Sequence, residues 1–285
     1  MNKARRFVFL LLTVLAFLIF TGCQTTSLLL KEKYTDPLVL DETTLCPEHV
    51  IWSDIEVNGK ADHSFQKTSF KITKEKIEWK CVKIDLDTPG LELTALPLAD
   101  TKGSHFYLKD FSRKTGAIVA VNTVPFDMVL YLPVGILKIA GQEICPANEA
   151  YAALTFTENP LRAKIINHQN EEELSQCSYA FGGFFTILED GYIYGFEKYK
   201  RSRTAAGISD DGRFLYLFAT RGIGSATGRN GLNFEECAII LRKLGCSDAM
   251  EFDGGHSSGL TVNGRNELKP VFQRKIPAAF GIKYN

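Results

Sequence analysis

A glycine-rich stretch near the C-terminus, Asp248–Gly259, carries two further acidic residues and a histidine that could do acid–base chemistry. The apolar run before Asp253 predicts a short strand, and the glycines after it predict a turn where a ligand can approach the main chain. If Glu251 lies in that strand, side-chain alternation places it on the same face as Asp253. Asp253, Glu251 and His256 are therefore the candidate catalytic residues. The alternative is an ordinary turn in which Asp253 bonds its own backbone, because Asp and Gly are common turn residues.

The same stretch contains Gly255-His-Ser-Ser-Gly259, which matches the G-x-S-x-G pattern of serine hydrolases. That pattern requires a helix directly after the serine, and an acid and a histidine later in the chain. Here a hairpin-like sequence follows, with no histidine after His256 and no aspartate after Asp253. We therefore reject a serine hydrolase.

The elements that must position this stretch are mostly strands. Alternating apolar and polar residues predict strands within positions 46–115, with a short helix at Phe106–Lys114. Apolar runs predict three more strands, at Ala117–Val121, Tyr131–Ile139 and Tyr151–Phe156. Asp-Gly and Asn-Gly pairs between apolar runs predict three hairpins, which turn at Gly191, Gly212 and Gly264.

One helix is strongly predicted, from Phe234 to Leu244. Asn233 can cap its first turn, with Glu236 completing a capping box, and Gly245 can end it. Its apolar residues recur at helical spacing, so one face should pack on the sheet. We predict one α+β domain at residues 46–285, with a mixed, twisted β-sheet and a few packed helices.

The N-terminus resembles the signal of a bacterial lipoprotein. Three basic residues precede an apolar run, Phe7–Phe20, and Thr21-Gly22-Cys23 follows directly. We predict cleavage after residue 22, lipidation of Cys23 and a membrane-proximal tether over residues 23–45. The protein would then lie in the bacterial cell envelope, anchored to a membrane and facing the periplasm or the cell surface. An ordinary signal peptide or a short anchor is the alternative.

Charge and cysteine content limit the other functions. The formal net charge is zero, and no Lys/Arg-rich block suggests a nucleic-acid partner. Six cysteines follow Cys23, at positions 46, 81, 145, 177, 237 and 246, without a C-x-x-C pair. A zinc or redox site is therefore poorly supported, whereas disulfides and buried thiols both remain open. No cofactor is expected, and a divalent cation near the acidic residues stays open.

Taken together, the motifs from Ala117 to the C-terminus resemble the phosphodiester glycosidases, the family of N-acetylglucosamine-1-phosphodiester α-N-acetylglucosaminidase. The resemblance rests on the order and spacing of six segments: Val121-Asn122, Phe181–Phe184, Arg203–Gly207, Gly231–Ala238, Phe252–Ser258 and Arg274–Phe280. The sequence departs from the family pattern at three positions: Thr123, Asn233 and His256.

The resemblance implies cleavage of a sugar-1-phosphodiester at its glycosidic bond. Such a site needs cations around the phosphate, and a carboxylate to stabilise an oxocarbenium-like centre or to activate water. Asp253 is the first choice for that carboxylate. Glu251 is either its partner or a buried acid paired with one of the arginines, and His256 either transfers a proton or only forms hydrogen bonds in the turn. The expected substrate-binding residues are Arg203, Arg221 and Arg229 for the phosphate, Asn122 for a sugar hydroxyl, and Gly254, Gly255 and Ser257 in the turn. The alternatives are that the arginines are surface bases and that Asn122 only caps a strand end. A non-catalytic surface lipoprotein that binds carbohydrate in the same cleft is the alternative.

Overall fold

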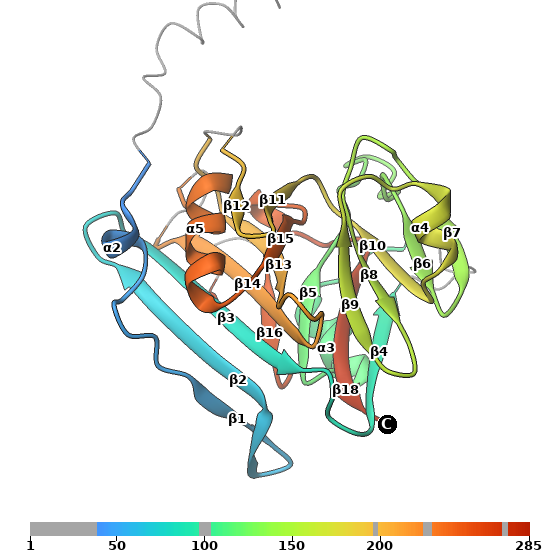
Figure 1. Cartoon of the computed structure of the whole chain (residues 1–285), viewed down its shortest axis with the longest axis horizontal. Helices are drawn as coiled ribbons and strands as arrows, with labels where there is room; N and C mark the ends of the chain where they lie inside the picture. The colour runs from blue at the N-terminus through green and yellow to red at the C-terminus, as the bar shows by residue number, and fades with distance from the viewer. Residues whose placement is uncertain (1–38, 97–103, 196–198, 225–229, 270–272) are drawn as a thin grey trace, which may run out of the picture. The chain divides into compact units, whose positions relative to one another are not determined.

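Three antiparallel β-sheets organise the chain (Figure 1). The structure is a computed structural model, and it describes residues 39–96, 104–195, 199–224, 230–269 and 273–285. These residues belong to one unit, Val39–Asn285, so residues 39–45 of the predicted tether are part of it. Cys23 and Arg229 lie outside the described residues.

The largest sheet has eight strands in the order β1-β2-β3-β14-β13-β15-β11-β12. Their bounds are β1 Ser53–Val57, β2 Lys60–Ile72, β3 Ile77–Asp85, β14 Phe214–Gly222, β13 Arg203–Ile208, β15 Asp248–Glu251, β11 Thr186–Glu189 and β12 Tyr192–Ile193. The hairpins predicted at Gly191 and Gly212 are confirmed as β11–β12 and β13–β14.

The architecture is compatible with the predicted α+β class but is dominated by β-sheet. Every strand pair in the described residues is antiparallel, so the predicted mixed sheet is wrong. The sequence runs from β14 through helix α5 (Phe234–Leu244) to β15, as in a parallel crossover. In the sheet, however, β13 lies between β14 and β15 and pairs antiparallel with both. The hairpin partner of β14 therefore occupies the place that a parallel neighbour would take.

Helix α5 begins and ends where the sequence predicts. The Asn233 side chain accepts from the Glu236 amide, the Glu236 side chain accepts from the Asn233 amide, and Gly245 closes the helix in the left-handed conformation. Its apolar face, including Cys237 and Leu241, packs on the sheet face that carries Trp79 and Phe218 (Figure 1). This packing fixes the N-terminal end of α5 relative to the ends of β13 and β15.

The other face of the large sheet shares a core with two five-stranded sheets. One has the order β7-β6-β10-β8-β9, with β7 Gln142–Cys145, β6 Leu137–Ile139, β10 Tyr179–Gly182, β8 Ala153–Thr157 and β9 Arg162–Ile166. The other has the order β17-β16-β5-β18-β4, with β17 Arg265–Asn266, β16 Leu260–Val262, β5 Val119–Asn122, β18 Ala279–Tyr284 and β4 Leu91–Leu96. The third predicted hairpin, at Gly264, is β16–β17.

The remaining helices are short: α2 Glu42–Leu45, α3 Leu108–Thr115 and α4 Glu171–Ser175. The helix predicted at Phe106–Lys114 is present as α3, which begins at Leu108 and ends at Thr115. The predicted strand Tyr131–Ile139 is wrong over its first half, because only Leu137–Ile139 forms β6. Tyr131 and Gly135 have positive φ angles of 54° and 102°, which a regular extended strand does not contain.

The six cysteines after residue 23 are buried, and none of them forms a disulfide. Cys237 and Cys246 belong to the core between α5 and the large sheet, where a thiol packs as a small apolar group. Among the described residues, no helix is both long and apolar enough to cross a membrane.

Candidate active site

Asp253 follows the last residue of β15 by two positions and is held there by its main chain. The Phe252 amide donates to the Thr204 carbonyl at 2.8 Å, and the Asp253 amide donates to the Thr123 carbonyl at 2.9 Å. These bonds join the turn to the ends of two different sheets. The Asp253 backbone is therefore fixed before any ligand binds.

Asn122, at the end of β5, provides a second brace for the same turn. Its side-chain amide donates to the Asp253 carbonyl at 2.7 Å. Its side-chain oxygen accepts from the Thr204 hydroxyl at 2.8 Å and from the Gly259 amide at 3.0 Å. Only 1% of Asn122 is exposed, and it does not line the adjacent pocket. In this structure Asn122 supports the turn from behind, whereas the sequence predicted a contact with a sugar hydroxyl.

The turn opens into a pocket of about 630 Å³. Its walls come from the loop after β5, the residues after β10, the start of β13, the first turn of α5, the Asp253 turn and the segment before β18. The lining residues are Pro125, Phe126, Met128, Phe184, Phe185, Arg201, Arg203, Phe234, Asp253, Gly254, Gly255, His256 and Arg274. Several predicted site residues thus meet in one cavity, together with others that the sequence did not single out.

The two positions after Asp253 require glycine for different structural reasons. A Cβ on Gly254 would lie 3.0 Å from the Ser202 carbonyl, so a side chain would push the turn away from β13. Gly255 has φ +64° and open space around its Cβ position. The main chain at Gly255 is therefore accessible from the pocket, as close approach of a ligand requires.

Burial raises the pKa of Asp253 to about 6, while the nearby Ser257 hydroxyl and the positive charge of Arg274 work in the opposite direction. Ser257 is 5% exposed, and its hydroxyl has no well-formed hydrogen bond within the part of the chain that the structure describes. We infer that Ser257 lies near the Asp253 carboxylate without a well-formed hydrogen bond. At neutral pH most of the Asp253 carboxyl groups are ionised.

Arg203 supplies a buried cation to the pocket. Its Nε donates to the Leu232 carbonyl at 3.0 Å, and its Nη2 donates to the Tyr199 carbonyl. The guanidinium lies over the Phe234 ring, 4.3 Å from the centroid. Two carbonyls and one ring therefore orient a side chain that is only 5% exposed.

Two more arginines line the same pocket, and the sequence analysis did not select them. Arg201 is exposed at its rim. Arg274 is half-buried, and its Nη1 contacts the Met128 sulfur at 3.1 Å. Arg274 is the first residue of the Arg274–Phe280 segment that resembles the family, and that position could have identified it as a site residue. Arg201 is separated from Arg203 by one residue in the same strand-like segment, where alternation predicts a shared face.

Glu251 does not line the pocket. Its carboxylate is 0% exposed on the face of β15 that packs against α5, and neither oxygen has a well-formed hydrogen bond to another described residue. Burial raises the pKa of Glu251 to about 7, partly offset by the charge of Arg203 and the thiol of Cys237. β15 ends at Glu251, and of the two predicted carboxylates only Asp253 lines the pocket. Glu251 is a buried acid beneath Arg203.

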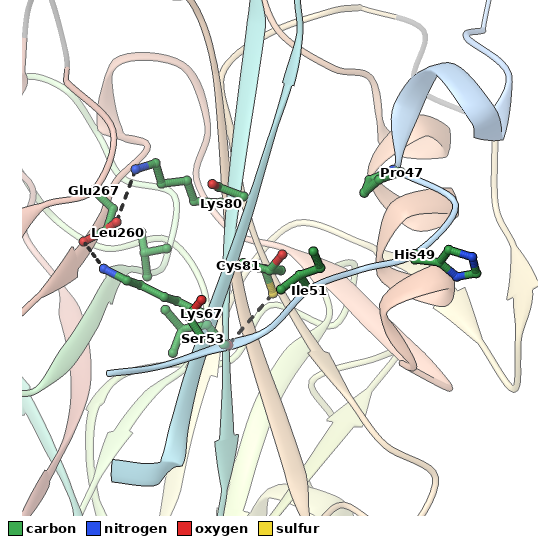
Figure 2. A pocket seen from close by; sticks show the side chains of 12 residues that line it. Pro47, His49, Ile51, Ser53, Lys67, Lys80, Cys81, Leu260 and Glu267 are labelled. Carbon is green, nitrogen blue, oxygen red and sulfur yellow. Dashed lines mark hydrogen bonds and ion pairs between the residues drawn. The ribbon is translucent and has the colours of Figure 1, made fainter. Parts of the chain in front are cut away.

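Arg221 lies elsewhere. It is 7% exposed, donates to the Ser258 carbonyl at 3.3 Å and lines a separate cavity beside Gly222 and Leu268. Burial lowers its pKa. A third cavity, of about 490 Å³, lies over β2 and β3, where Lys67 and Lys80 both pair with Glu267 (Figure 2). Its charges are paired with one another, and none of the predicted site residues lines it.

The pocket supplies one carboxylate, Asp253, and several nitrogen donors, which is a poor ligand set for a divalent cation. Within the described ranges, no group of three or more His, Cys, Asp or Glu side chains could hold a metal ion. The arrangement suits an anion bound by arginines next to a carboxylate.

A family model described as phosphodiester glycosidase matches residues 115–283. The chain belongs to the phosphodiester glycosidase family. The matched range contains every pocket-lining residue. No curated protein sequence matches the chain significantly.

Solved structures share the fold of this chain at low sequence identity. A hypothetical protein from Synechocystis has a TM-score of 0.66 and 15% identity over 83% of this chain, which spans 64% of that protein. The catalytic domain of zebrafish N-acetylglucosamine-1-phosphodiester α-N-acetylglucosaminidase, auto-inhibited by its pro-peptide, has a TM-score of 0.62 and 16% identity over 89% of this chain and 86% of that one. An exported protein from Burkholderia pseudomallei has a TM-score of 0.52 and 13% identity over 72% of this chain and 74% of that one.

Proposed function

We propose that this pocket hydrolyses a sugar-1-phosphodiester at the bond between the anomeric carbon and the phosphate oxygen. The observation that carries the proposal is the meeting of Asp253 with Arg201, Arg203 and Arg274 in one cavity. Three cations around one carboxylate match a substrate that is anionic at one end and develops positive charge at the other.

The arginines bind and stabilise the phosphate. Arg203 is held in place by carbonyls and by Phe234, so its orientation is set before the substrate arrives. When the glycosidic bond breaks, its electron pair goes to the phosphate oxygen, and the guanidinium groups stabilise that charge. A phosphate leaving group departs as a stable anion, so the pocket does not need a strong general acid.

Asp253 acts on the sugar side of the same bond. A carboxylate with a pKa of about 6 is mostly charged at neutral pH, which suits stabilisation of an oxocarbenium-like centre and activation of water. The water oxygen bonds to the anomeric carbon, and one water proton passes through Asp253 to solvent or to the released phosphate. The products are the free sugar and a phosphomonoester.

Aromatic rings complete the pocket and favour a sugar ligand. The rings of Phe126, Phe184, Phe185 and Phe234 line it. Flat apolar rings can pack against the C–H faces of a sugar while the arginines bind its phosphate. His256 lies at the same turn, where it can contact a sugar hydroxyl or the phosphate.

The test is hydrolysis of a panel of sugar-1-phosphodiesters, beginning with N-acetylglucosamine 1-(methyl phosphate), with both products measured. The proposal expects free sugar and methyl phosphate in equal amounts. Binding of these esters with no turnover across the panel would favour the non-catalytic carbohydrate-binding alternative. Release of sugar 1-phosphate and methanol would contradict the bond assignment, since it requires cleavage on the other side of phosphorus.

We also propose that the enzyme is anchored in the bacterial envelope through lipidated Cys23. The basic start, the apolar run Phe7–Phe20 and Thr21-Gly22-Cys23 support it. Cys23→Ala should release the protein from the membrane fraction or block removal of the signal. Unchanged processing together with unchanged membrane association would refute the anchor.

A further inference from the structure

The loop that forms one wall of the pocket ends in an exposed apolar tip. The loop connects β5 to β6, and its Pro125, Phe126 and Met128 line the pocket. At the tip, Met128, Val129 and Leu130 expose 65%, 85% and 61% of their surfaces. Three consecutive exposed apolar side chains beside a binding pocket indicate a contact surface, because scattered single residues are the usual case on a soluble domain.

The tip is held in its shape by bonds within the loop. The Asp127 carboxylate accepts from the Val129 and Leu130 amides, both at 2.8 Å. The Asp127 amide donates to the Leu132 carbonyl at 2.9 Å, and the Tyr131 ring stacks on His105 with centroids 4.2 Å apart. The apolar side chains are therefore presented on a preorganised turn, which reduces the ordering cost of binding.

The tip is continuous with the cationic part of the pocket. Met128 is both a lining residue and a tip residue, and its sulfur contacts the Arg274 guanidinium at 3.1 Å. Burial raises the pKa of Asp253, and the charge of Arg274 partly offsets that rise, so Arg274 acts on the carboxylate as well. A ligand whose phosphate lies beside Arg274 would therefore place any chain attached to that phosphate next to Met128.

We propose that the substrate carries a hydrocarbon chain on its phosphate, and that the tip residues Met128, Val129 and Leu130 bind the first part of that chain. The substrate would then be a sugar joined through one phosphate to a lipid-type alcohol. The presence of a sugar on this substrate rests on the proposed function. The binding of the phosphate and of its hydrocarbon chain rests only on Arg274 and the tip residues.

Charge favours a single amphiphilic ligand over general attachment to a membrane surface. Segment 125–135 contains one acidic residue, Asp127, and no Lys or Arg. A loop that docks on anionic lipid normally carries basic residues around its apolar part. Here the cations line the pocket, where they meet one phosphate, and the apolar residues continue outward from it.

Calorimetric titration of the purified protein with monomethyl phosphate and monodecyl phosphate, both below micellar concentration, tests the proposal. Decyl phosphate should bind about tenfold more tightly or better, which is about 1.4 kcal/mol. The double variant Val129→Ser, Leu130→Ser should lose that gain. The matched control is Ile51→Ser, which removes an apolar side chain that is 78% exposed and lines the separate cavity in Figure 2, and it should keep the gain.

Equal affinity for the two phosphates would overturn the proposal. So would a double variant that keeps the decyl gain and instead loses sedimentation with phosphatidylcholine vesicles, because that result assigns the tip to the membrane. The binding measurement needs no turnover. If the protein binds decyl phosphate more tightly than methyl phosphate but hydrolyses no sugar phosphodiester, the proposed hydrolysis is contradicted. The proposal that the tip binds a hydrocarbon chain is then still supported.

Discussion

The side-chain amide of Asn122 donates to the main-chain carbonyl of Asp253 at 2.7 Å, across 131 positions of sequence. The same Asn122 side chain also accepts from Thr204 and Gly259, so one buried residue joins the ends of β5 and β13 to the turn. The position of the candidate catalytic carboxylate thus depends on a residue that does not line the pocket.

Asn122→Ala should destabilise the protein and misplace Asp253 together. It removes three hydrogen bonds, and of the groups involved only the Gly259 amide and the Thr204 hydroxyl keep a partner, each other at 3.2 Å. The unfolding free energy should therefore fall by roughly 2 kcal/mol in a denaturant titration. The matched control is Asn230→Ala, whose side-chain amide donates to the Glu75 carbonyl at 3.4 Å in an exposed position. That control should lose less than about 1 kcal/mol, because water replaces the bond. If the two variants lose equal amounts of unfolding free energy, Asn122 does not stabilise the turn more than an exposed asparagine would.

Arg203→Lys should reduce kcat/KM by about tenfold or more while the protein stays folded. A lysine keeps the charge but cannot bond two carbonyls and stack on Phe234 in one fixed orientation. Arg213→Lys is a matched control, because Arg213 also uses two nitrogens, on Asp85, and lies over the Phe214 ring at 4.9 Å, outside the pocket. Full activity in Arg203→Lys would show that a point charge at this position suffices.

Glu251→Gln should change how stability depends on pH. The folded-state pKa of Glu251 is raised from 4.5 to about 7, so the folded state retains a proton that the unfolded state has lost over this window. The wild-type unfolding free energy therefore falls as pH rises from 4.5 through 7, because ionising the buried Glu251 carboxyl destabilises the folded state. Relative to wild type, the variant should gain roughly 3 kcal/mol between pH 4 and pH 8. A difference that stays constant across this range would contradict a raised Glu251 pKa.

Local signals in the sequence predicted the elements that carry the site. Asn233, Glu236 and Gly245 define α5 by capping chemistry that acts within a few residues, and the Asp-Gly and Asn-Gly turns define the hairpins in the same way. The glycine turn after Asp253 was visible for the same reason. Each of these depends on neighbours in sequence.

The pocket itself depends on contacts that no local pattern encodes. Phe126, Phe185 and Arg201 reach it from segments that are far apart in the chain. Glu251 is buried beside Cys237 of α5 and Arg203, and its absence from the pocket depends on how α5 packs on the sheet, which alternation alone does not predict. Asn122 was selected for a sugar contact because its type suits one, whereas its three bonds to distant backbone and side-chain groups give it a supporting position.

Asp253→Asn, assayed for hydrolysis and thermal unfolding on the same preparation, tests the central claim most directly. The substitution keeps the shape and removes the charge, so kcat/KM should fall by about a thousandfold or more, equivalent to about 4 kcal/mol of barrier, with little change in Tm. The control is Asp248→Asn, which changes a carboxylate at the start of β15 and outside the pocket. It should retain activity. An Asp253→Asn protein that turns over a sugar-1-phosphodiester at the wild-type rate would contradict the assignment of this pocket as the catalytic site.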